Sequence, residues 1–92
     1  AGGHYNPAKK PHGLPPSTNR HAGSFGNIKA NENGEGTLVF LDNTISISRN
    51  RHPIIGRSVV VHAKRDDGGQ PAGNAGPRVA VGVIGVTNPS VN

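Results

Sequence analysis

The chain has 92 residues and a mass of 9.5 kDa, which suits one small domain and excludes a two-domain enzyme. Hydrophobic residues make up only 32% of it, so a large core cannot come from this chain alone. The net charge of +5 would suit a polyanion, but the basic residues are spread out, and one tyrosine and two phenylalanines give no platform for stacking bases. We therefore expect no nucleic-acid partner.

Fourteen glycines and eight prolines leave little room for long helices, so the composition favours an all-β chain. Cysteine is absent, which excludes disulfides and thiolate ligands and does not decide between a cytoplasmic and an extracellular location. The longest apolar stretches, residues 37–41 and 78–86, are shorter than the roughly 20 residues that cross a bilayer, so we expect no membrane partner. Because the chain starts without Met, we expect a processed protein or a piece of a longer one.

Residues 1–23 have no hydrophobic period and contain four prolines and three histidines, His4, His12 and His21. We predict a long functional loop here, since imidazole is the commonest protein ligand for zinc and copper and a metal would order the loop. The spacings match no short zinc-finger pattern, so on composition alone plain surface histidines are an equal alternative. His52 is assigned to the surface.

A β-hairpin is predicted next, because residues 25–30 and 36–42 flank Asn31-Glu32-Asn33-Gly34, whose Asn-Gly pair supplies the positive φ angles of a tight turn. Residues 44–48 alternate between polar and apolar and predict a half-buried extended segment, followed by a basic loop at residues 49–53.

Two strands are predicted in the second half of the chain. Residues 56–63 contain a β-branched run that ends on His62, and residues 66–69 form a turn. Residues 78–86 alternate valines with small residues, as in a curved sheet. Five or fewer strands leave open sheet edges, so we expect missing strands and self-association.

Several segments together resemble one known family, the copper/zinc superoxide dismutases. They match in order and with the family's spacings from residue 1 to about residue 86. The segments are Gly3-His4-Tyr5-Asn6-Pro7, His12-Gly13, Asp66-Asp67, and residues 20–28, 54–62 and 73–85.

The resemblance implies a Greek-key β-barrel of eight strands, of which this chain supplies the C-terminal part. Residues 1–23 would be the zinc loop, residues 24–86 strands and connecting loops, and residues 87–92 a tail. The N-terminal part of the same domain would be a partner, and we expect a homo-oligomer.

Copper and zinc are the cofactors that the resemblance implies, and superoxide is the substrate. Arg78 and His4 would be the catalytic residues. The implied roles are His4 as the bridge between copper and zinc, His12 and His21 as zinc ligands, His62 as a copper ligand, Arg78 as the cation that guides superoxide, and Asp66 as the carboxylate that hydrogen-bonds a histidine of each metal.

The chain departs from the family pattern in several places. Ser24 stands where the family has an aspartate as the fourth zinc ligand, and a neutral hydroxyl binds zinc less well. Val81 replaces a disulfide cysteine, and only residues 67–72 separate Asp66 from Gly73, so the loop between them is short. Two further copper histidines would lie upstream of this chain.

The function implied is dismutation of superoxide to O₂ and H₂O₂ in a domain completed by N-terminal strands. The alternative is a non-enzymatic metal-binding or structural protein on the same barrel, which the departures favour. Retention of His4, His62, Asp66 and Arg78 favours the enzyme. A copper-chaperone function is disfavoured because the chain has no cysteine pair for copper transfer.

Overall fold

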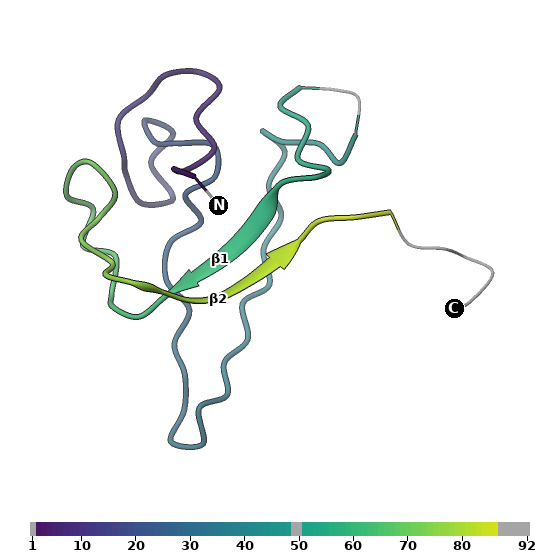
Figure 1. The fold of residues 1–92 in the computed structure, drawn as a ribbon. Helices are drawn as coiled ribbons and strands as arrows, with labels where there is room; N and C mark the ends of the chain where they lie inside the picture. The colour runs from purple at the N-terminus through teal and green to yellow at the C-terminus, as the bar shows by residue number, and fades with distance from the viewer. Residues whose placement is uncertain (1, 49–50, 87–92) are drawn as a thin grey trace.

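The computed structural model describes residues 2–48 and 51–86, and its regular secondary structure there is one antiparallel pair of strands (Figure 1). Strand β1 is Ser58–His62 and strand β2 is Arg78–Val83. The rest of the described chain consists of turns, bends and extended segments, which confirms the all-β prediction. The predicted tail at residues 87–92 and residues 49–50 of the predicted basic loop lie outside the described residues.

Valine-rich sequences form β1 and β2, in line with the preference of β-branched residues for strands. Both strands are shorter than the predicted ranges, 56–63 and 78–86. Pairing extends beyond the N-terminal end of β1, where Gly56 N donates to Ile84 O at 2.8 Å. The φ of Gly56 is +81°, which limits the regular strand on this side. The register shifts between Val61 and His62, so that His62 pairs with Arg78.

The predicted hairpin turn is present, but its flanking strands are not. Gly34 N donates to Asn31 O at 3.0 Å and Asn31 N to Glu35 O at 2.7 Å, which closes a three-residue loop. Only Gly34 has a positive φ, +80°, so the prediction that the Asn-Gly pair supplies two such angles is wrong. Residues 25–30 and 36–42 run side by side (Figure 1) without a ladder of strand hydrogen bonds. Residues 27–41 are exposed throughout, and an isolated hairpin is marginally stable.

The predicted segment at residues 44–48 is reduced to a single bridge between Ser46 and Pro53. Ile54 N donates to Ser46 O at 2.9 Å and so continues this contact. Ile45 is half-buried as predicted, whereas Ile47 is 60% exposed, because none of the described elements covers that face.

The interior of the described chain is polar rather than apolar. Ala75 is the only buried hydrophobic residue among the described residues, whereas His12, Ser24 and Asp66 are each at most 9% exposed. The prediction of a small core is therefore confirmed. None of the described segments is a helix of the length and apolarity that would cross a membrane.

Candidate metal centre

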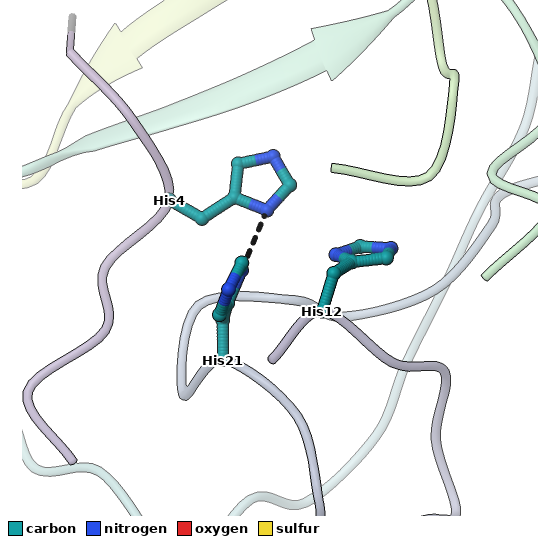
Figure 2. A group of neighbouring side chains, drawn as sticks. All are labelled: His4, His12 and His21. Carbon is teal, nitrogen blue, oxygen red and sulfur yellow. Dashed lines mark hydrogen bonds between the residues drawn. The ribbon is translucent and has the colours of Figure 1, made fainter. Parts of the chain in front are cut away.

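Residues 2–23 form a loop without helix or strand, as predicted, and this loop folds back so that three imidazole rings converge (Figure 2). Gly23 N donates to Tyr5 O at 2.9 Å, which closes the loop beside His4. A Cβ atom at Gly23 would lie 3.0 Å from the Tyr5 Cβ, so this close approach favours glycine. The contact brings the segment that carries His21 and Ser24 against His4.

The ring nitrogens of His4, His12 and His21 offer ligand atoms that all lie within 4.8 Å of one another. His4 Nδ1 is 3.2 Å from His21 Nδ1. Ser24 Oγ lies 3.2 Å from both His4 Nδ1 and His12 Nδ1. Zinc ligands at about 2.0–2.1 Å in a tetrahedron are about 3.3 Å apart, so these spacings match three edges of a zinc coordination shell. The three imidazoles and the hydroxyl therefore fit a zinc ion.

The electrostatics at His4 and His21 favour neutral imidazoles. Burial lowers the pKa of His4, and the neighbouring His12, His21 and His62 lower it further. Burial also lowers the pKa of His21, with a second contribution from His12. Because a neutral imidazole has a lone pair free to bind a metal, these shifts favour binding of a cation at His4 and His21.

Asp66 fixes the orientation of the His12 ring. His12 Nε2 donates to Asp66 Oδ1 at 2.7 Å, which leaves His12 Nδ1 to face the centre. Asn27 holds Asp66 in turn, because its side-chain amide pairs with both the N–H and the C=O of Asp66 at 2.8 and 3.0 Å. A Cβ at Gly73 would lie 2.6 Å from His12 Nε2, so only glycine fits against this pair. Asp66 bonds to no second histidine within the described residues.

His62 and Arg78 lie next to this cluster. His62 Nδ1 donates to Gly76 O at 2.9 Å, so its Nε2 is the nitrogen left free to bind a metal. The His4 and His62 rings are 6.1 Å apart between centroids, and the second nitrogen of His4 lies on the side of its ring away from His21 (Figure 2). A cavity of about 540 Å³ is lined by His4, His62 and Arg78. Arg78 Nη2 donates to Gly2 O at 2.5 Å.

Sequence reasoning missed three supporting side chains. They are Asn27 on Asp66, Gln70 on the main chain of His12, and Arg57, whose guanidinium carbon lies 3.7 Å from the centre of the Tyr5 ring. These partners lie far apart in sequence, so no local pattern could have shown them. His52, assigned to the surface, is half-buried. Its ring centroid lies 6.4 Å from that of Tyr5, and it does not belong to the histidine cluster.

Comparisons with known proteins agree with this geometry. The family model described as copper/zinc superoxide dismutase matches residues 1–84. The superoxide dismutase [Cu-Zn] of Cryptococcus neoformans var. grubii is 50% identical over 95% of this chain and 60% of its own length. That of Saccharomyces cerevisiae is 47% identical over 96% of this chain and 61% of its own length.

The extracellular superoxide dismutase [Cu-Zn] of Haemonchus contortus is 44% identical over 94% of this chain and 50% of its own length. The crystal structure of the clock protein EA4 superposes with a TM-score of 0.86 and 46% identity, over 94% of this chain and 59% of that chain. This chain thus spans 50 to 61% of the length of these relatives.

Proposed function

Because this chain belongs to the copper/zinc superoxide dismutase family, we propose that it forms the metal-binding part of an enzyme that converts superoxide into O₂ and H₂O₂. The observation that carries the proposal is the convergence of the His4, His12 and His21 nitrogens at spacings that suit a tetrahedral ion. His62 and Arg78 line the same cavity as His4.

Zinc would be held by His4, His12 and His21, with Ser24 Oγ as a weak fourth ligand in place of a carboxylate. Copper would be held by His4 and His62, together with histidines from the N-terminal part of the domain. Copper bound there would supply one-electron redox chemistry, by which two superoxide ions and two protons become O₂ and H₂O₂.

The chain's own residues supply charge, orientation and a proton site. Arg78 is permanently positive and lines the cavity, so it would attract the superoxide anion and orient it. His4 turns its Nδ1 toward the zinc ligands, so its Nε2 is the atom that can hold and release a proton on the copper side. The Gly76 carbonyl fixes the His62 ring.

We also propose that N-terminal strands complete the domain and that the completed protein forms a homo-oligomer. Support comes from the bare faces of the sheet, where the valines of β1 and β2 leave apolar surface in water: Val59, Val61, Val79, Val81 and Val83 are 41 to 77% exposed. This chain covers only part of the length of its relatives, which also supports the proposal that further strands complete the domain. Relatives named as extracellular are among the matches, and a cytoplasmic or an extracellular location would suit this chain.

The test uses the complete domain, loaded with copper and zinc, and follows superoxide decay after pulse radiolysis. We expect a catalysed rate that the His62→Ala variant loses together with its copper, while its zinc content is unchanged. The His52→Ala variant is the matched control, because His52 lies outside the cluster, and it should keep both metals and the rate. Metal-loaded protein without a catalysed rate would favour the non-enzymatic barrel.

A further inference from the structure

The side chain of Gln70 pairs with both main-chain groups of His12. Gln70 Oε1 accepts from His12 N at 2.9 Å, and Gln70 Nε2 donates to His12 O at 2.7 Å. We propose that Gln70 is a positioning residue, which fixes the main chain of His12 so that His12 Nδ1 is held on the metal. This inference rests on the proposed zinc centre.

One short loop holds His12 at two points. Asp66 binds the Nε2 end of the ring, and Gln70, four residues later, binds the backbone. The loop is closed by its own hydrogen bonds, since Asp67 N donates to Gly73 O at 2.9 Å and Gly73 N donates to Gly69 O at 2.7 Å. Because Asp66 and Gln70 belong to one closed unit, the ring and the backbone of His12 are fixed relative to each other.

The main chain of His12 has no other support in the described part of the protein. The residue is only 3% exposed, and its N–H and C=O take part in no backbone–backbone hydrogen bond among the described residues. Pro11, which precedes it, has no N–H to donate. Since buried main-chain groups without partners destabilise a conformation, loss of the Gln70 amide would release His12 from its position.

Because the loop at residues 67–72 is short, the contact between Gln70 and His12 depends on the length of the glutamine side chain. Six residues, 67–72, separate Asp66 from Gly73, and Gly68 packs on Leu14, where an added Cβ would meet Leu14 Cδ1 at 3.4 Å. The loop therefore lies directly on the segment that carries His12, and the length of a glutamine side chain spans the gap. Asparagine is one methylene shorter and would not make both bonds.

The experiment measures zinc affinity by chelator competition in the complete domain. Gln70→Met keeps the side-chain length and removes the amide, and Gln70→Asn keeps the amide and shortens it. We expect zinc affinity to fall about tenfold or more in both variants, which is typical for loss of a partner that orients a metal ligand. The absorption spectrum of bound Co²⁺ should change as well, because the geometry at His12 changes.

Asn31 supplies a matched control, because its amide oxygen likewise accepts from main-chain N–H groups, those of Asn33 and Glu35, in an exposed turn that contains no ligand. Asn31→Leu removes that amide with little change in size and should keep zinc affinity within about twofold. Zinc affinities of Gln70→Met and Gln70→Asn that equal that of the unsubstituted protein would overturn the inference.

A measurement on the unsubstituted, metal-free domain covers the case in which the variants do not fold. The His12 amide should exchange with solvent more slowly than the amide of Gly13, because Gln70 accepts its hydrogen bond. Fast exchange of the His12 amide would overturn the inference. Unsubstituted protein that binds no zinc would contradict the proposed metal centre instead, and fast exchange of the His12 amide in that protein would still count against the contact with Gln70.

Discussion

His62 and Arg78 are opposite one another across the β1–β2 ladder, at the point where the register shifts after Val61. Such a bulge bends the strand and redirects the side chain that follows it. The shift therefore places a candidate copper ligand and a permanent cation at the same end of the sheet, where both line the cavity next to His4. Two residues 16 positions apart in sequence become neighbours through one strand pairing.

Arg78→Ala should slow superoxide decay about tenfold or more, on the order of 1.4 kcal/mol, because the positive charge that attracts the anion is lost. Arg78→Lys should recover part of the rate, since it restores charge without the planar guanidinium. The measurement is the second-order rate constant at low ionic strength, with copper occupancy determined in each sample. An unchanged rate would mean that Arg78 has only a structural role, through its hydrogen bond to Gly2 O.

Ser24→Asp should raise zinc affinity, because a carboxylate would replace a neutral hydroxyl at a position 3.2 Å from the nitrogens of His4 and His12. Chelator competition measures the change, and the site of the unsubstituted protein should be the more labile one. Equal affinities would mean that residue 24 does not contact the ion.

Asp66→Asn should lower zinc affinity about 10- to 100-fold, because the charged acceptor for His12 Nε2 is lost. Asp67→Asn is the matched control, since Asp67 is exposed and bonds to Gly69 N and to Asn74 rather than to a histidine. Similar losses in the two variants would show a general effect of loop charge instead of an effect of the His12 contact.

The 92-residue chain by itself should be partly unfolded or self-associated. Its described part buries one hydrophobic residue, Ala75, which is too little to offset roughly 1–2 kcal/mol of backbone entropy for each ordered residue. Light scattering and calorimetry check this prediction. A sharp cooperative transition from a monomer would show that the open strand edges are stable without further strands.

The sequence predicted the parts of the fold that depend on local chemistry. β-branched residues identified β1 and β2, and Gly34 marked the tight turn. Residues 25–30 and 36–42 did not form the predicted strands, because a ladder needs neighbours and a covered face, and residues 27–41 are exposed.

The candidate site was predictable in a different way. The spacing of His4, His12 and His21 did not decide whether they are metal ligands or ordinary surface histidines. The family resemblance favoured metal ligands. Asn27 and Gln70 could not be found from sequence, because each side chain binds main-chain groups of a residue in a distant segment. Main-chain groups are the same in nearly every residue type, so they leave no pattern in the sequence.

The zinc-edge X-ray absorption spectrum of the reconstituted domain tests the zinc centre most directly. The structure predicts three imidazole nitrogens and one oxygen at about 2.0–2.2 Å, from His4, His12, His21 and Ser24. His21→Ala should remove one imidazole from the spectrum, whereas His52→Ala should leave the spectrum unchanged. A six-coordinate shell of oxygen ligands, without imidazole scattering, would contradict a zinc site formed by these residues.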